Sequence, residues 1–143
     1  ILDITMLYEI KVSFSIININ QQELSSIEKI NNSSIWLKGE KISKKGKITY
    51  TNNGWILNSG LQSNEELVCH LKSIIENINE SRDIINLFCM KYESELSLTI
   101  FVYYENFEDE EHNTPSLHFD KDIIKLLSDL NSELDIDLYV LKK

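Results

Sequence analysis

The residues best suited to bind a metal are two histidines and the acidic side chains near them in the C-terminal third of the chain. Glu110, Glu111 and His112 are followed closely by His118 and Asp120. A zinc site needs three or four converging ligands, and the spacing of these residues matches no zinc pattern. The acidic run also lacks the spacing and the glycine of a calcium-binding loop. We therefore expect neither a metal nor any other cofactor.

One cysteine stands beside a histidine, as a nucleophile stands beside its base. Cys69 and His70 fall in a helical pattern, however, and successive helical residues point about 100° apart. We therefore expect both cysteines, Cys69 and Cys89, to be packed free thiols of a reducing compartment. No nucleophile elbow or phosphate-binding glycine loop occurs in the chain. The sequence does not predict an enzyme.

Asp135 and Asp137 form the remaining candidate for catalysis. They alternate along a predicted strand and so share one of its faces, about 6.5–7 Å apart. This separation is compatible with a pair of carboxylates in acid–base catalysis. Nothing in the sequence indicates a neighbour that would tune their pKa values, and an outward, solvated pair is the favoured interpretation.

The charge distribution points toward a type of partner. The net charge is −9, and it is uneven, because residues 1–62 carry 5 acidic and 7 basic side chains whereas residues 63–143 carry 18 acidic and 7 basic ones. An acidic surface repels phosphate backbones, so we expect no nucleic acid as partner. It speeds association with a basic protein. No apolar run approaches the roughly 18 residues of a membrane span, so no membrane partner is expected.

The strands that would position these residues are indicated by alternation with a period of two. Residues 7–17 and 95–104 alternate most clearly, and shorter strands are expected at 34–42, 47–51 and 55–57. In the last strand the residues expected to face inward are Leu134, Ile136, Leu138 and Val140.

Helices are indicated by apolar residues at steps of three and four. A short one is expected over residues 21–30. A long one should begin at Ser63, because Ser63 and Glu66 have the spacing of a capping box. Ser81 and Asp120 are expected to cap two further helices. The inward residues of the last helix should include Ile123, Ile124, Leu127 and Leu130.

Strands with one apolar and one polar face are typical of an antiparallel sheet that is covered on one side. We therefore predict a single α+β domain over residues 1–143, with a mostly antiparallel sheet and helices packed on one face, broadly similar to a ferredoxin-like fold.

Three short segments carry a resemblance to a known family. They are Leu37–Glu40, Gly54–Gly60 and Leu134–Tyr139. In this order and at this spacing they resemble the bacterial family known as domain of unknown function 4279, over about residues 8–140. The resemblance implies an α+β fold and a bacterial, cytoplasmic setting, and it implies no activity.

The side chains on the polar face of the sheet form the candidate binding site. The expected site residues are Phe101, Tyr103, Asp135, Asp137 and Tyr139, extended by the acidic loop residues Glu108, Asp109, Glu110 and Glu111. Aromatic rings among carboxylates are typical of a surface that binds a basic protein.

The favoured function is a small acidic protein-interaction module. Its specific form would be an immunity-type inhibitor that neutralises a basic toxin. The alternatives are a small-molecule-binding domain and an undetected hydrolase. A deep pocket lined by Trp36, Trp55 and the polar strand face would favour the small-molecule-binding domain. The oligomeric state is left open.

Overall fold

The computed structural model describes residues 8–104 and 115–142. Its strands are β1 (Tyr8–Ile17), β2 (Ser33–Trp36), β3 (Gly54–Asn58), β4 (Glu93–Tyr104) and β5 (Glu133–Lys142). Its helical segments are the 3₁₀ turn η1 (Gln21–Ser26) and the α-helices α1 (Leu67–Glu80), α2 (Arg82–Lys91) and α3 (Lys121–Asp129).

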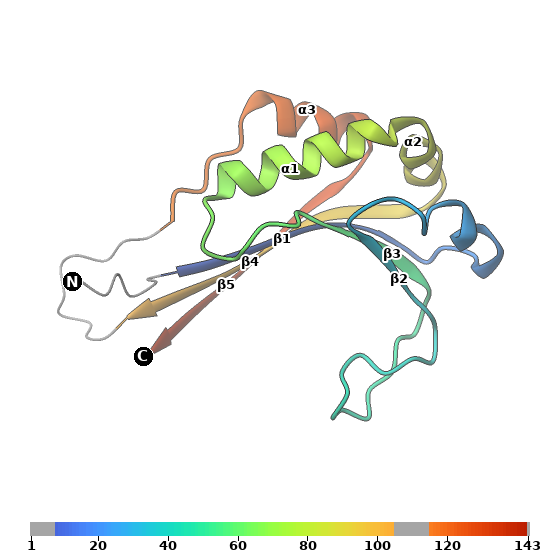
Figure 1. The fold of residues 1–143 in the computed structure, drawn as a ribbon, viewed down its shortest axis with the longest axis horizontal. Helices are drawn as coiled ribbons and strands as arrows, with labels where there is room; N and C mark the ends of the chain where they lie inside the picture. Colours follow the sequence, from blue (N-terminus) through green and yellow to red (C-terminus); the bar gives the residue numbers. More distant parts are fainter. Residues whose placement is uncertain (1–7, 105–114, 143) are drawn as a thin grey trace.

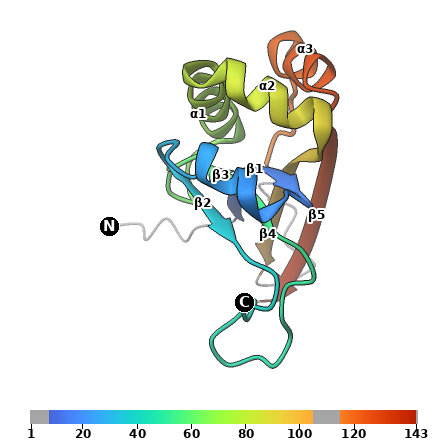
Figure 2. The same ribbon diagram turned by 90° about the vertical axis from the view of Figure 1, so that its right-hand side faces the viewer.

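The strands form one sheet in the order β2-β3-β1-β4-β5. The pairs β2–β3, β3–β1 and β1–β4 are antiparallel, and β4–β5 is parallel. A parallel pair needs a crossover connection, which α3 supplies. The three α-helices lie on the same side of the sheet (Figures 1 and 2). The predicted α+β fold, with a mostly antiparallel sheet and helices on one face, is confirmed.

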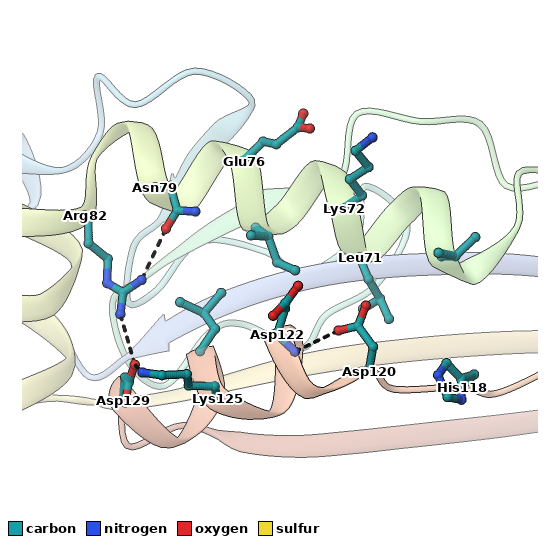
Figure 3. A pocket seen from close by; sticks show the side chains of 13 residues that line it. Leu71, Lys72, Glu76, Asn79, Arg82, His118, Asp120, Asp122, Lys125 and Asp129 are labelled. Atoms are coloured by element: carbon teal, nitrogen blue, oxygen red, sulfur yellow. Dashed lines mark hydrogen bonds and ion pairs between the residues drawn. The ribbon is translucent and has the colours of Figure 1, made fainter.

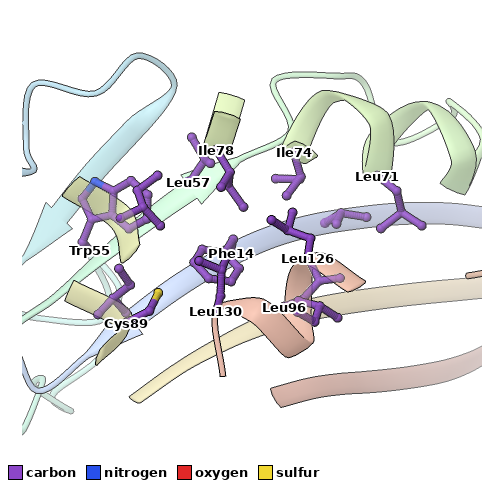
Figure 4. Packing of buried hydrophobic residues seen from close by; sticks show 14 of the residues in the cluster. Phe14, Trp55, Leu57, Leu71, Ile74, Ile78, Cys89, Leu96, Leu126 and Leu130 are labelled. Carbon is purple, nitrogen blue, oxygen red and sulfur yellow. The ribbon is translucent and has the colours of Figure 1, made fainter. Parts of the chain in front are cut away.

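The core lies between β1, β4 and the helices (Figure 4). Alternation along β1 turns Val12 and Phe14 toward the helices, where they pair with Leu98 and Leu96 of β4. Side chains of α1, including Ile74, cover them, and none of these residues is more than 3% exposed. Their burial is the main source of stability for a layer of this kind.

The predicted helix starts at Asp120 and Ser63 had different outcomes. Asp120 caps α3, because its carboxylate accepts hydrogen bonds from the amides of Asp122 and Ile123 at 3.0 and 3.1 Å. The predicted capping box is wrong, since α1 begins at Leu67 and its first turn receives no side-chain cap. The Ser63 carbonyl instead accepts a hydrogen bond from the Ile10 amide at 2.8 Å, which ties this segment to β1.

Only part of the predicted strand pair 34–42 and 47–51 forms. β2 ends at Trp36, and the segment 37–53, here named the lysine hairpin, contains one isolated bridge between Lys41 and Thr49. It turns away from the helices (Figure 2). The turn requires a glycine at Gly39, whose φ of +91° is unfavourable for other residues.

Three predictions of burial are wrong. Cys69 is exposed, whereas Cys89 is buried as expected. Ile124 is 57% exposed, because the buried side of α3 is formed by residues such as Leu126. The four apolar residues of β5 that were expected to face the core are between 39% and 58% exposed. They lie on the helix side of the sheet, but at its edge, where the helices do not cover them.

Candidate functional site

The face of the sheet opposite the helices, here named the outer face, carries an aromatic pair. Phe101 of β4 stands directly beside Tyr139 of β5 in the parallel register. Their rings are stacked, with centroids 5.3 Å apart and planes inclined by 19°. The Nζ atom of Lys11 lies 5.8 Å from the centre of the Phe101 ring, within the range of a cation–π contact. These three side chains form a small platform.

Carboxylates border this platform. Asp137 and Asp135 precede Tyr139 on the same face of β5, and their neighbours on β4 are Thr99 and Ser97. Tyr103 lies on the same face one step beyond Phe101. The structure therefore places all five of the predicted site residues that it describes on one face, and it brings Phe101 and Tyr139 into contact. It also adds Lys11, which the alternation of β1 places on this face but which sequence reasoning did not select.

The predicted acidic loop lies outside the described residues. Glu108, Asp109, Glu110 and Glu111 fall between the two described ranges, as does His112. Within residues 8–104 and 115–142, no three His, Cys, Asp or Glu side chains are grouped closely enough to hold a metal ion.

The other side of β5 carries a second exposed feature, which sequence reasoning placed in the core. Its four members are here named the apolar row: Leu134, Ile136, Leu138 and Val140. Each pairs with an apolar residue of β4, and three of those partners are no more than 1% exposed. The apolar surface of the core thus continues outward onto β5 and emerges there into solvent.

A groove of about 610 Å³ runs between α1 and α3 on the helix side (Figure 3). Its floor is apolar and includes Leu71, Ile75 and Leu126. Three of the charged groups at its rim are engaged with one another. The Arg82 guanidinium lies 3.7 Å from the Asp129 carboxylate, and Lys125 donates to the same carboxylate at 2.9 Å.

A serine and a histidine pair inside the protein. The Ser59 hydroxyl lies 2.6 Å from Nδ1 of His70, and the Leu61 amide donates to the Ser59 oxygen at 3.4 Å. Burial lowers the pKa of His70, so the ring is neutral at pH 7. Ser59 and His70 are 5% and 1% exposed, and neither lines the groove between α1 and α3. The pair therefore holds the start of α1 against the end of β3 and is closed to a substrate.

The two cysteines have different surroundings. Cys69 projects into solvent next to the buried His70, so the two side chains point apart, as the helical spacing predicts. Burial raises the pKa of the Cys89 thiol, which disfavours the nucleophilic thiolate. Neither arrangement activates a cysteine for catalysis.

The two tryptophans lie on opposite faces of the sheet. Trp55 pairs with Ile35 on the helix side and is fully buried. Trp36 pairs with Gly54 on the outer face, stacks on Tyr50 at 5.7 Å and donates to the Asn52 side chain at 3.0 Å. The two rings therefore line no common pocket.

Within the two described ranges, no helix has both the length and the apolar character needed to cross a membrane.

The comparisons with known proteins identify a family and nothing closer. No curated protein and no solved structure matches the chain. The family described as "Domain of unknown function (DUF4279)" matches residues 8–141, which is nearly the whole sequence. The resemblance seen in the three short segments is thereby confirmed, and the chain belongs to the DUF4279 family.

Proposed function

We propose that this protein is an interaction module that binds a basic protein partner through the outer face of its sheet. The observation that carries the proposal is the stacked pair of Phe101 and Tyr139, which stands beside Asp137 on a face that the helices leave uncovered. Aromatic rings contribute much of the binding energy of protein interfaces, and surrounding charges select the partner.

The electrostatics of this face support a basic counterpart. Glu133, Asp135 and Asp137 follow one another on the outer side of β5, and Glu95 lies beside Glu133 on β4. Lys11 is the basic residue in contact with the aromatic pair. Such a field accelerates encounter with a positively charged protein and repels acidic ones.

The specific form that we propose is a bacterial, cytoplasmic immunity-type inhibitor that neutralises a basic toxin. A reducing compartment is supported by the two cysteines, which are both free thiols, one of them on the surface. The form rests on the analogy between small acidic domains without a catalytic constellation and inhibitors of this class.

The test uses the purified product of the gene immediately upstream and measures its affinity for this protein by calorimetry. Tyr139→Ala and Tyr103→Ala should each weaken binding by more than about 1 kcal/mol, because each removes aromatic area from the interface. Leu87→Ala is the matched control, since Leu87 is 66% exposed on α2, on the other side of the sheet. If both tyrosine variants remain folded and bind with full affinity, the interface is wrongly placed. If the upstream product does not bind, the immunity form is wrong.

A second candidate, a small-molecule-binding domain, is favoured by the groove between α1 and α3. Its volume of about 610 Å³ lies in the range of small-molecule sites. Its apolar floor would hold a ligand whose charged groups reach Lys72 or Lys125 at the rim. Thermal-shift screening of small organic acids tests this function. A stabilisation that Leu71→Ala leaves unchanged would exclude the groove as the ligand site.

A further inference from the structure

β5 is a long edge strand with one unused side. It has ten residues, and all of them are exposed. One side of the strand pairs with β4 along its whole length. In the part of the chain that the structure describes, no strand pairs with the other side, where alternate residues present their backbone N–H and C=O groups. Figure 2 shows β5 at the outer limit of the sheet.

β5 lacks three of the usual protections of an edge strand: it is not short, bulged or interrupted by proline. Natural edges are shortened, bulged, interrupted by proline or provided with charged side chains, especially lysines. β5 pairs in an unbroken register from Glu133 to Lys142 and contains no proline. Toward the helix side it presents the apolar row, and only its last position, Lys142, places a charge on this side. Such an edge is a template for a further strand.

The two faces of β5 define which strand would fit. On the helix side, the apolar row would be covered by apolar side chains of the incoming strand. On the outer side, the same strand would meet Glu133, Asp135 and Asp137, and would need basic side chains there. Because strand residues alternate between faces, the complementary sequence alternates apolar residues with Lys or Arg.

In the registers with the longest overlap, a second copy of this chain fits the edge less well. An antiparallel pair that joins the two apolar rows also joins the two acidic sides. Centred on Asp137, it sets the two Asp137 side chains directly opposite each other, and centred on Ile136 it sets Asp135 opposite Asp137. Centred on Leu138, it leaves carboxylates on diagonal positions about 7–8 Å apart. Each copy also carries a net charge of −9.

We propose that the free side of β5 binds a β-strand of a basic partner in which Lys or Arg alternates with apolar residues. This inference rests on the proposed function and specifies how the partner docks. The backbone hydrogen bonds extend the sheet by one strand, the apolar row becomes covered, and the carboxylates select the charge of the strand. The platform of Phe101 and Tyr139 then continues the interface across the outer face.

The test uses a synthetic peptide of five Val-Lys repeats, matched in length to the ten residues of β5. Binding is measured by calorimetry at low salt. The comparison peptides are five Val-Glu repeats, a peptide with the same composition but its lysines in one block, and a Val-Lys peptide N-methylated at alternate residues along one side. We expect the Val-Lys peptide to bind, and each comparison peptide to bind at least about tenfold more weakly.

Protein variants then locate the site. Leu138→Ser should weaken binding of the Val-Lys peptide about tenfold or more, because it removes an apolar side chain that the bound peptide would cover. The double variant Asp135→Lys/Asp137→Lys should exchange the preference, so that the Val-Glu peptide now binds better. Glu80→Lys/Asp83→Lys changes the net charge equally on the helices and should leave the preference unchanged. The exchange is a gain of binding, so it is not mimicked by a variant that fails to fold.

Several results would overturn the inference. The first is that the Val-Lys peptide does not bind below about 1 mM, and the second is that the N-methylated peptide binds equally well. The third is an unchanged peptide preference in the Asp135→Lys/Asp137→Lys variant. The fourth is a dimer in sedimentation that Leu138→Lys abolishes. Equal binding of the N-methylated peptide combined with a loss in Tyr139→Ala would leave the proposed function standing, because the partner would then bind the face without adding a strand. Failure of the proposed function is seen separately, in the tyrosine variants with the upstream product.

Discussion

At one edge of the sheet β2 has four residues and leads into the lysine hairpin, whereas at the other edge β5 has ten residues with an exposed apolar row and an acidic outer side. The short, lysine-flanked edge is of the kind that discourages further pairing. The long edge has the features that permit it. Since both edges belong to one sheet, this difference is the reason for placing the proposed binding surface at β5.

The two edges of the sheet also differ in charge. The lysine hairpin carries five lysines and one glutamate, Glu40, whereas β5 carries three carboxylates and one lysine, Lys142. The protein is therefore electrically polarised across its sheet. The proposed basic partner would be guided toward β5 and away from β2.

The largest expected effect is a difference in stability between variants of two side chains that pair across β4 and β5. Leu98 of β4 is 1% exposed and Ile136 of β5 is 39% exposed, and both point to the helix side. Leu98→Ala should lower the free energy of unfolding by about 2–5 kcal/mol, because it leaves a cavity in the core. Ile136→Ala should cost less than about 1 kcal/mol, because its site opens to solvent. Urea denaturation measures both, and equal losses would mean that β5 belongs to the core.

The next effect concerns the packing of Trp36 on Gly54 at the β2 edge of the sheet. A Cβ atom at Gly54 would lie 1.9 Å from the ring of Trp36, which crosses this glycine on the outer face. Gly54→Ala should therefore destabilise the protein by about 1–3 kcal/mol through overpacking.

The control for this prediction removes the ring. Trp36→Ala alone loses the stacking on Tyr50, but in the Gly54→Ala background it should relieve the clash, so the two losses should be clearly non-additive. Additive losses in denaturation would show that the contact between Trp36 and Gly54 does not secure this edge.

The effect of pH on stability should differ between the region at the end of β3, where His70 is buried, and the exposed edge at β5. Burial holds the pKa of His70 below its ordinary value of 6.5, so the folded protein favours the neutral ring. The unfolded chain therefore takes up the proton first when the pH falls. The resulting stability is fully present above pH 6.5 and is lost as the pH falls below it toward the folded-state pKa.

His70→Asn removes this contribution, and the fall in stability between neutral pH and pH 5 should become shallower. His118→Asn is the control, since His118 is exposed. Amide exchange below pH 6.5 should accelerate near the contact between Ser59 and α1 before it changes in β5. Identical pH profiles for the wild type and the His70→Asn variant would contradict the assignment.

The smallest effect on stability is expected for a lysine placed on the exposed edge. Val140→Lys introduces at β5 the protection that natural edge strands use. Because Val140 is 58% exposed, the free energy of unfolding should change by no more than about 0.5 kcal/mol. Binding of the Val-Lys peptide should nevertheless weaken, since a charge now stands in the apolar row. A large loss of stability would show that Val140 is packed.

Much of the fold follows from the sequence because alternation reports which residues share a face. The faces of β1 and β4 and the cap at Asp120 were predicted in this way. Alternation does not report what covers a face, and for this reason the apolar row was assigned to the core. Likewise, Ser63 and Glu66 have the spacing of a capping box, but the hydrogen bond between the Ser63 carbonyl and the Ile10 amide depends on a contact that is distant in sequence.

The candidate site was predictable to a similar extent. Phe101, Asp137 and Tyr139 share a face by alternation, but their proximity depends on the parallel register of β4 and β5, which a sequence alone does not fix. The contact of Lys11 with Phe101 depends on the register between β1 and β4 as well. The sequence therefore predicted which residues of the candidate site share a face, but not which of them are in contact.

The most direct test of the central claim is amide hydrogen exchange in β5 with and without the Val-Lys peptide. In the free protein, alternate β5 amides should be protected by pairing with β4, and the others should exchange rapidly. The account predicts that bound peptide slows the rapidly exchanging set and leaves exchange in the lysine hairpin unchanged. Unchanged exchange in β5, with new protection at the groove between α1 and α3, would contradict it.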